Sequence, residues 1–192
     1  MTDAVKVRPV TPSRWDDLEA LFGPSGAYSG CWCMWFRETS AEFDRNGNVG
    51  NRKALAALVR KNRQPGLLAY VDDRPAGWVS VAPRDEFGRI ERSPVLKPVD
   101  DRPVWSVVCF FIDKRFRGRG LGKRLLDAAV DHAARKGARV IEAYPRDPGT
   151  GREVTNAEAF VGLLPMFEAA GFREVARRST DRPIVRREVR RR

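Results

Sequence analysis

The spacing of apolar residues divides the chain into segments of two kinds. Seven segments have the alternating or continuous apolar pattern of β-strands: residues 4–10, 67–71, 76–82, 104–112, 138–144, 172–178 and 184–189. Four have the spacing of amphipathic helices: a segment capped at Ser13, and residues 51–62, 121–136 and 156–170. The order of these segments predicts an α/β fold with a mixed sheet. Residues 104–112 do not alternate, which predicts a central strand covered on both faces.

The segments between these elements are predicted as loops. Residues 23–37 have neither a helical nor a strand period, and they are rich in glycine and aromatic residues. Thr39 and Glu42 have the spacing of a capping box, which predicts a short helical turn before a break at residues 46–48. No segment has the composition of a linker. We therefore expect residues 1–192 to form a single domain with an aromatic loop insertion at about 23–50 and a basic C-terminal tail.

The chain is basic, and much of the excess charge lies near its C-terminus. Its 36 Lys and Arg against 25 Asp and Glu leave a formal net charge of +11. Eight arginines and two acidic residues lie between positions 177 and 192, a net charge of +6. Such a run is usually a solvated face, and here its apolar positions indicate a terminal strand with a frayed tail. A nucleic-acid-binding module that uses this run is the alternative, but the run lacks the aromatic residues of a single-strand platform. We do not expect nucleic acid as a partner.

Cysteine and histidine are too few for a disulfide framework or a zinc site. The chain has three cysteines, at positions 31, 33 and 109, and a single histidine, His132. The C-x-C spacing of the first two lacks the loop of a tetrahedral site, so we expect no metal. No apolar run reaches the roughly 20 residues that span a bilayer, and the first residues lack the pattern of a secretory signal. We therefore expect a cytoplasmic protein without a membrane partner.

The segment with the most specific chemistry lies between the central strand and the helix that follows it. Residues 115–123 read Arg-Phe-Arg-Gly-Arg-Gly-Leu-Gly-Lys. Glycine lets the backbone turn tightly and lets a ligand approach the peptide N–H groups. The first N–H groups of a helix have no partner inside it and, with the positive end of the helix dipole, form an anion site. With Arg115, Arg117, Arg119 and Lys123 around it, this turn predicts a pyrophosphate-binding site.

Other phosphate-binding loops fit this segment less well. The spacing Gly118-x-Gly120-x-Gly122 is not the G-x-G-x-x-G of dinucleotide-binding folds, and no acidic residue follows at the distance of a ribose ligand. No G-x-x-x-x-G-K-[ST] sequence occurs. A tight turn without a ligand is the remaining structural explanation.

The same turn carries a family resemblance. Arg117-x-x-Gly120-x-Gly122, after a strand and before Leu125-Leu126, resembles the coenzyme A pyrophosphate motif of the GNAT (GCN5-related) N-acetyltransferases. The segment Phe167-Glu168-Ala169-Ala170-Gly171-Phe172 is similar to the family's Y-E-x-x-G-F ending, so the resemblance extends over about residues 104–172. It implies a GNAT domain, with a mainly antiparallel sheet flanked by helices and a V-shaped splay between two central parallel strands.

The resemblance also implies acetyl-CoA as the acetyl donor and identifies the residues that would hold it. Phe110, Phe111 and Ile112 occupy the strand that binds the pantetheine arm through its backbone, and Asn156 opens the following helix. The pyrophosphate motif supplies the other cofactor-binding residues: Arg117, Gly118, Arg119, Gly120, Leu121, Gly122 and Lys123. The implied reaction transfers an acetyl group to a primary amine of a small-molecule or peptide acceptor, by direct attack in a ternary complex. The sequence leaves open whether the chain forms a homodimer.

One departure from the family pattern concerns the proton taken up by the leaving thiolate. Where many members have the tyrosine of Y-E-x-x-G-F, this chain has Phe167, which has no hydroxyl. Tyr144 is the candidate replacement, and otherwise the thiolate leaves unassisted. A GNAT-like protein that binds coenzyme A without catalysis is therefore a further alternative.

A base is also expected, because an alkylammonium acceptor must lose a proton before it attacks. Glu142 is the best-placed candidate, since a carboxylate within an apolar strand is costly unless it is paired or used. It can equally be the ion-pair partner of a neighbouring arginine, and Glu86 and Glu91 are further candidates. We expect His132 to pack in the core. Cys109 is expected to be a small apolar residue rather than a nucleophile.

The aromatic loop is the candidate acceptor site. Its rings, with Phe36 and Phe43, can form a pocket wall or can fill the core beneath a long loop. We assign Tyr28, Trp32 and Trp35 to acceptor binding. Aromatic walls favour an acceptor with apolar or cationic parts.

Overall fold

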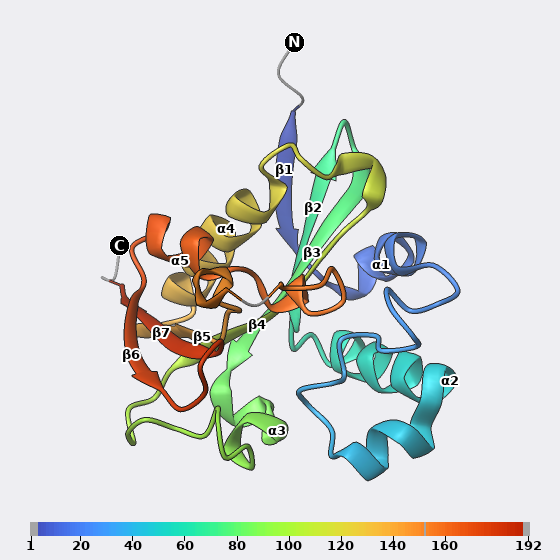
Figure 1. Ribbon diagram of the computed structural model, residues 1–192. Coiled ribbons are helices and arrows are strands. Elements are labelled where there is room, and N and C mark those ends of the chain that lie inside the picture. Colours follow the sequence, from blue (N-terminus) through green and yellow to red (C-terminus); the bar gives the residue numbers. More distant parts are fainter. Residues whose placement is uncertain (1–3, 152, 190–192) are drawn as a thin grey trace.

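The computed structural model describes residues 4–151 and 153–189. One sheet crosses the molecule, with helices on both sides of it (Figure 1). Its seven strands lie in the order β1-β2-β3-β4-β5-β7-β6. Their bounds are β1 Val5–Pro9, β2 Gly66–Val71, β3 Arg74–Pro83, β4 Trp105–Ile112, β5 Val140–Ala143, β6 Arg173–Arg177 and β7 Pro183–Glu188. The apolar pattern therefore located all seven, within two residues at each end.

The sheet is antiparallel except at its centre, where β4 and β5 run parallel. These two strands pair at three positions: Trp105 with Ile141, Ser106 with Glu142, and Val107 with Ala143. β5 then ends, whereas β4 continues along β3 to Ile112. The two strands consequently separate beyond Val107, which is the splay that the resemblance implied.

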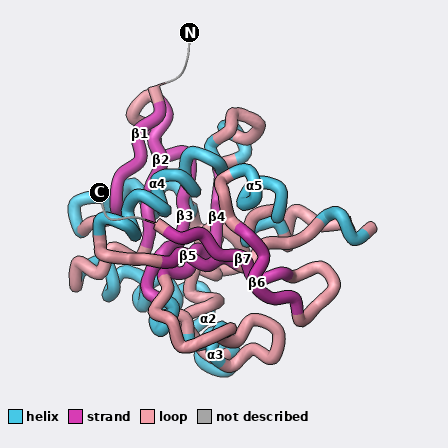
Figure 2. Tube along the Cα trace, turned by 90° about the vertical axis from the view of Figure 1, so that its left-hand side faces the viewer, coloured by secondary structure: helices cyan, strands magenta, loops and turns pink. Residues whose placement is uncertain are grey.

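Each face of the sheet is covered by its own core. Along β2, Leu67 and Ala69 belong to the core shared with α4 (Leu121–Arg135), whereas Leu68 and Tyr70 belong to the core shared with α1 (Trp15–Phe22) and α2 (Ser40–Arg60). Figure 1 shows α4 on the side of the sheet opposite α1 and α2, and Figure 2 shows the same sheet after a 90° turn. Because both faces are covered, the central strands read as continuous apolar runs.

The N-terminal helices differ from their sequence-based description. α2, Ser40–Arg60, begins with the expected capping box, in which the Thr39 hydroxyl accepts from the Glu42 N–H at 3.2 Å. At the predicted break, Gly47 has a non-helical φ of +53° and ψ of −162°, so two helical segments meet there in a kink. The residues of the aromatic insertion between 40 and 50 are helical on both sides of Gly47. α1, Trp15–Phe22, has no side-chain cap, so the cap predicted at Ser13 is wrong. The hydroxyl of Ser13 instead lies 3.0 Å from that of Thr11.

Two further helices are short. The predicted polar loop at residues 85–103 contains α3, Gly88–Glu91, and the last helix is α5, Leu164–Ala169. Among the described residues, every helix is too short or too polar to cross a bilayer.

The single helix predicted over residues 156–170 is wrong in its first half. The structure instead has a 3₁₀ turn at Ala159–Val161 followed by α5. Gly162 between them has φ +82°, and a Cβ at this position would lie 2.6 Å from the ring of Phe167. Pro165 then stands in the first turn of the new helix, where its missing N–H has no cost. Asn156 therefore lies in a turn and not at the start of a helix.

The described part of the basic C-terminal run comprises the last residue of β6, the turn after it and β7. Several of its arginines bind other parts of the protein. Arg177 pairs with Asp147 at 2.9 Å, Arg178 donates to the backbone carbonyl of Lys97 at 2.6 Å, and Arg187 donates to a carbonyl at the end of α5. Arginines engaged in this way are less available to the phosphates of a nucleic acid. Residues 190–192, the end of the predicted tail, lie outside the described residues.

His132 packs in the core, as expected. Its ring meets that of Trp105 edge to face, with centroids 6.0 Å apart, and its Nε2 is buried without a hydrogen-bond partner among the described residues. Burial, together with the nearby Lys136 and Arg135, lowers the pKa of His132 to about 4. The side chain is therefore neutral in the folded protein at neutral pH.

This burial predicts a loss of stability in acid. The folded pKa lies below the unfolded value of about 6.5, so between these values the unfolded chain binds more protons. The contribution of neutral His132 is complete above the unfolded pKa and is lost as the pH falls toward about 4. Acidification from about pH 7 to about pH 5 should cost the wild type roughly 1 to 2 kcal/mol more than a His132→Phe variant. Urea unfolding at both pH values measures this, and equal losses would contradict it.

Candidate active site

The turn between β4 and α4 leaves the N-terminus of α4 open. Gly118 and Gly120 have φ of +74° and +73°, and no atom lies within 4 Å of the place where either would carry a Cβ. Gly120 is the residue at which the helix begins, and no side chain caps it. The first peptide N–H groups of α4 therefore lack a side-chain partner and have open space beside the glycines. An anion fits such a helix end.

The cations that surround this turn differ in their contacts. Arg117 donates from Nε to the carbonyl of Ile112 at 3.1 Å, and its side chain also lines the cavity described below. Arg115 and Lys123 each pair with a nearby aspartate at 2.7 Å. The guanidinium of Arg119 lies 5.6 Å from the centre of an aromatic ring in the same turn. Arg117 therefore connects the turn to the cavity.

Two other members of the motif shape the turn from within. Leu121 is buried against Val71 and Ala76 on β2 and β3. A Cβ on Gly122 would lie 3.4 Å from Sδ of Met166, so a small residue lets α4 pack close to α5. These residues hold the helix end in place beside the sheet.

Beyond Val107, one edge of β4 has no strand partner among the described residues. On its other edge, Val107 pairs with Val81 and Cys109 pairs with Ser80, so Val108 is an extra residue in β4. Such a bulge bends a strand and increases its twist. Val108 and Cys109 consequently belong to the same core, and residues 109–112 line a cavity. The splay and the bulge together open the C-terminal half of β4 to a ligand.

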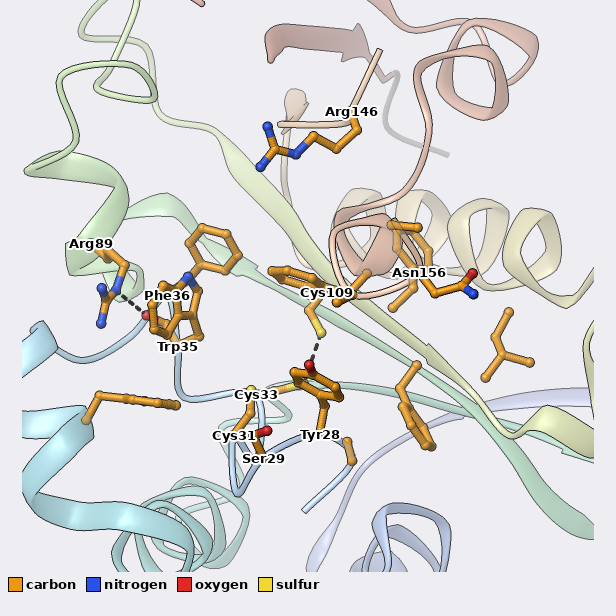
Figure 3. Close-up of a pocket in the computed structure, with 18 of the residues that line it drawn as sticks. Tyr28, Ser29, Cys31, Cys33, Trp35, Phe36, Arg89, Cys109, Arg146 and Asn156 are labelled. Carbon is orange, nitrogen blue, oxygen red and sulfur yellow. Dashed lines mark hydrogen bonds between the residues drawn. The ribbon is translucent and has the colours of Figure 1, made fainter. Parts of the chain in front are cut away.

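A cavity of about 820 Å³ lies beside this half of β4. Figure 3 shows side chains from β4, the aromatic loop and the segment around Asn156 gathered around it. Seven residues assigned from the sequence to cofactor or acceptor binding meet in its wall: Tyr28, Trp35, Phe110, Phe111, Ile112, Arg117 and Asn156. Phe36, Phe43 and Phe160 add further rings. The wall is therefore largely aromatic, and its size and apolar character suit an organic ligand.

Trp32 does not line this cavity. Its ring stacks on Trp15 at 6.2 Å and meets Phe22 edge to face at 5.6 Å, so it is buried in the core beside α1. Its indole N–H donates to an asparagine of α2. Trp32 thus anchors the aromatic loop, whereas Tyr28 and Trp35 reach the cavity.

The three cysteines gather at the same wall. Sγ of Cys33 lies 3.2 Å from Sγ of Cys109 and accepts a hydrogen bond from the indole of Trp78 at 2.9 Å. The hydrogen bond to Cys33, together with burial, raises the pKa of the Cys31 thiol, and burial raises that of Cys33. Thiols with a raised pKa are poor nucleophiles, because the thiolate is the reactive form. In the part of the chain that the structure describes, no cluster of His, Cys, Asp and Glu side chains is arranged to hold a metal.

Glu142 and Tyr144, the two candidate catalytic residues, lie together but outside the cavity wall. Both are buried, and the Tyr144 hydroxyl donates to the Glu142 carboxylate. The other carboxylate oxygen accepts from Nε of Arg186 at 2.7 Å. Burial, and then the charge of Glu142, raise the pKa of Tyr144, so the phenol stays protonated. This arrangement favours the ion-pair role for Glu142 over the role of general base.

The other two candidate bases, Glu86 and Glu91, also accept hydrogen bonds from arginines. Glu86 accepts hydrogen bonds from two arginines at 2.7 and 3.0 Å, and Glu91 accepts one at 3.2 Å. Neither lines the cavity, and no Asp or Glu stands in its wall among the described residues. Phe167 is buried, with its ring against those of Phe110 and Phe172.

Three arginines of the cavity wall were absent from the sequence-based site: Arg89, Arg146 and Arg182. The guanidinium of Arg89 lies 3.9 Å from the ring centre of Trp35. These arginines come from α3, the segment after β5 and the turn before β7. A single arginine in a loop has no periodicity and belongs to no motif, so no sequence signal distinguished these three from the chain's other arginines.

The sequence model of the acetyltransferase (GNAT) family matches residues 30–152, which include β4, the glycine turn and α4. The chain belongs to the GNAT acetyltransferase family. An uncharacterized N-acetyltransferase from Methanocaldococcus jannaschii is 24% identical over 87 residues, which are 45% of this chain and 34% of that protein. The match to this GNAT relative thus spans about a third of the relative's length.

Solved structures of similar fold cover nearly the whole GNAT chain. One is described as an acetyltransferase, with a TM-score of 0.62 and 16% identity over 96% of this chain and 100% of that one. Another is yncA from Salmonella typhimurium with its cofactor acetyl-CoA, with a TM-score of 0.56 and 17% identity over 96% and 94%. At these identities the likeness establishes the fold.

Proposed function

We propose that this GNAT protein is an N-acetyltransferase that transfers the acetyl group of acetyl-CoA to a primary amine. One observation carries the proposal. The open, glycine-formed N-terminus of α4 follows the splayed half of β4, and one largely apolar cavity is lined by residues 109–112 of β4 and by Arg117 of the turn. An anion site beside an unpaired strand edge and an apolar pocket suits a donor that has a pyrophosphate, a chain of amides and a thioester.

The residues of this chain would hold the donor in three places. The first N–H groups of α4, with Arg117, bind the pyrophosphate. The unpaired edge of β4 at residues 109–112 offers backbone donors and acceptors to the pantetheine amides. A backbone N–H near Phe111 or Ile112 stabilises the negative charge that develops on the carbonyl oxygen. Bound acetyl-CoA supplies an activated acyl group, and the protein's main contribution is to position it against the amine.

We further propose direct attack by the amine in a ternary complex. The raised pKa values of Cys31 and Cys33 disfavour an acyl-cysteine intermediate. Since the described cavity wall has no carboxylate, the ammonium proton leaves to water, or the amine arrives uncharged. Phe167 cannot protonate the leaving thiolate, and Tyr144 lies outside the wall. We propose that the thiolate leaves without a protein acid.

Calorimetry and a free-thiol assay test this function. Titration of the intact chain with acetyl-CoA should give a dissociation constant of roughly micromolar order. Incubation with acetyl-CoA and a panel of amino acids, alkylamines and short peptides should release free thiol with at least one amine above the hydrolysis background. Binding without amine-dependent release would identify the non-catalytic alternative. Absence of binding would refute the proposal.

A further inference from the structure

The charged side chains that line the cavity are basic rather than acidic. Four arginines line it, Arg89, Arg117, Arg146 and Arg182, and no acidic side chain lines it among the described residues. Arg117 belongs to the turn before α4, where the proposed function places the pyrophosphate. The other three come from elements that the donor site does not use. Their charge therefore calls for a different explanation.

Arg182, like Arg89, forms no ion pair with a described carboxylate. Its Nε donates to the backbone carbonyl of Tyr144 at 2.8 Å, but no described carboxylate forms an ion pair with it. Its Nη2 is buried and has no hydrogen-bond partner in the described part of the chain. Burial and the neighbouring Arg146 lower its pKa to about 10, so it remains charged at neutral pH. Asp181 and Glu158 lie near enough to offset part of this lowering, but neither forms an ion pair with Arg182. A partly buried guanidinium whose Nη2 lacks a partner favours an anionic ligand beside it.

The carboxylates nearest to Arg182 form their ion pairs with Arg146. Arg146 pairs with Asp181 at 2.7 Å and with Glu158 at 3.3 Å, so these acidic groups serve Arg146. The Nε of Arg146 is itself buried without a partner among the described residues. Two adjacent guanidinium groups thus line one wall, and the acidic side chains beside them are already engaged.

The remainder of the wall restricts the body of the ligand. Rings from Trp35, Phe36, Phe111 and Phe160 provide an apolar surface large enough for an aromatic or branched aliphatic group. The expectation that aromatic rings favour a cationic acceptor is not supported, because Arg89 already lies over Trp35. Polyamines and lysine-rich peptides would be repelled by the positive charge of Arg89 and Arg182.

We infer that the acceptor is an amine that also carries an acidic group, a carboxylate or a phosphate, on an apolar body, and that Arg182 binds the acidic group. The planar guanidinium suits both anions, because its N–H groups can form paired hydrogen bonds with two oxygens. This inference rests on the proposed function, since it specifies the acceptor class of the same cavity.

Equilibrium binding of amine-free compounds tests the inference without requiring turnover. The probes are 3-phenylpropionate, its neutral amide 3-phenylpropionamide, and 2-phenylethylphosphonate, each titrated into the intact chain with and without coenzyme A. The wild type should bind 3-phenylpropionate at least about tenfold more tightly than the amide, as expected for hydrogen bonds to a charged group. The phosphonate shows which of the two anions fits better.

Variants connect this preference to Arg182. Arg182→Met should reduce the acid-to-amide ratio to about one, because it keeps the apolar length of the side chain and removes the charge. Arg182→Lys should retain part of the acid-to-amide ratio, since it keeps the positive charge but loses the planar guanidinium that forms paired hydrogen bonds. The matched control is Arg173→Met, an exposed arginine of the adjacent β6, which should leave the ratio unchanged.

The possible results distinguish a failure of the inference about the acceptor from a failure of the proposed function. Equal binding of acid and amide by the wild type, or no binding of either, overturns the inference. The inference also fails if Arg182→Met weakens coenzyme A binding as strongly as it weakens 3-phenylpropionate binding, because Arg182 would then serve the donor. If the acid is preferred but acetyl-CoA does not bind, the anion site stands and the proposed function fails.

Discussion

A Gly120→Glu variant should lose acetyl-CoA affinity by about a hundredfold or more. Gly120 has φ +73°, a conformation that costs a residue with a Cβ about 1 to 2 kcal/mol. The new carboxylate would stand at the start of α4, where the pyrophosphate is proposed to bind, and the repulsion between the two anions adds about 1 kcal/mol or more. Together these terms amount to roughly 3 kcal/mol, which corresponds to that loss. Calorimetry with acetyl-CoA measures it.

The opposite end of the same helix provides a matched control. Gly137 also has a positive φ, +93°, and no atom lies within 4 Å of the position of its Cβ. A Gly137→Glu variant therefore introduces a similar backbone strain and the same charge, but beyond the C-terminus of α4. It should leave the acetyl-CoA dissociation constant within about twofold of the wild type.

A third variant separates strain from charge at the turn. Gly120→Ala introduces the backbone strain without the charge. Its affinity for acetyl-CoA should therefore lie between that of the wild type and that of Gly120→Glu. An equal loss of affinity in Gly120→Glu and Gly137→Glu would contradict a donor site at the open end of α4. An unchanged affinity in Gly120→Glu would contradict it as well.

Truncation of Glu142 should destabilise the protein more than any other change proposed for the sheet. Its carboxylate accepts from Tyr144 and from Arg186, and Nη1 of Arg84 lies 3.8 Å away. Arg186 is also held by Asp100 at 2.6 Å, and this contact lowers the pKa of Asp100 to about 2. The group thus joins β5, β7 and the loop before β4 inside the molecule.

Glu142→Ala removes one charge from this buried network and leaves the others. Loss of one partner of a buried ion pair costs about 3 to 5 kcal/mol, because the remaining charge is uncompensated. For a chain of this size the midpoint of thermal unfolding should fall by roughly 6 to 20 °C. Turnover of the protein that remains folded at low temperature should stay within about tenfold of the wild type, because Glu142 does not line the cavity. Calorimetric unfolding and the free-thiol assay measure the two effects.

The control is Glu91, an exposed carboxylate that, like Glu142, lies near Arg84. Glu91 pairs with Arg84 at 3.2 Å near the surface, so Glu91→Gln should cost less than about 1 kcal/mol. The conservative Glu142→Gln variant distinguishes the two roles of Glu142. A fall in turnover of several orders of magnitude with little change in the unfolding midpoint would support the general base instead of the ion pair.

The local features of this fold could be predicted from sequence, since they depend on neighbours along the chain. Apolar alternation located the strands, and the run at residues 104–112 identified the central strand, β4. The glycines after β4 indicated the open helix end, because a positive φ is a property of the residue itself. The family motif then added the donor site. The first half of the helix predicted at residues 156–170 failed because Gly162 and Pro165 outweighed its apolar spacing.

The environment of each side chain was decided by contacts between residues distant in sequence. Trp32 and Trp35 are near neighbours in one loop, yet Trp32 is buried beside α1 and Trp35 lines the cavity. The sequence left Glu142 as either a general base or the ion-pair partner of an arginine, and its hydrogen bond with Arg186, which is 44 residues away, favours the ion pair.

The sequence by itself determined the order of strands and helices, the glycine turn and, through the motif, the donor. The tertiary structure alone decided that Arg89, Arg146 and Arg182 share a wall to which no described carboxylate contributes. Periodicity and glycine conformation act over a few residues, whereas the charge balance of a cavity is a sum over segments that only folding brings together.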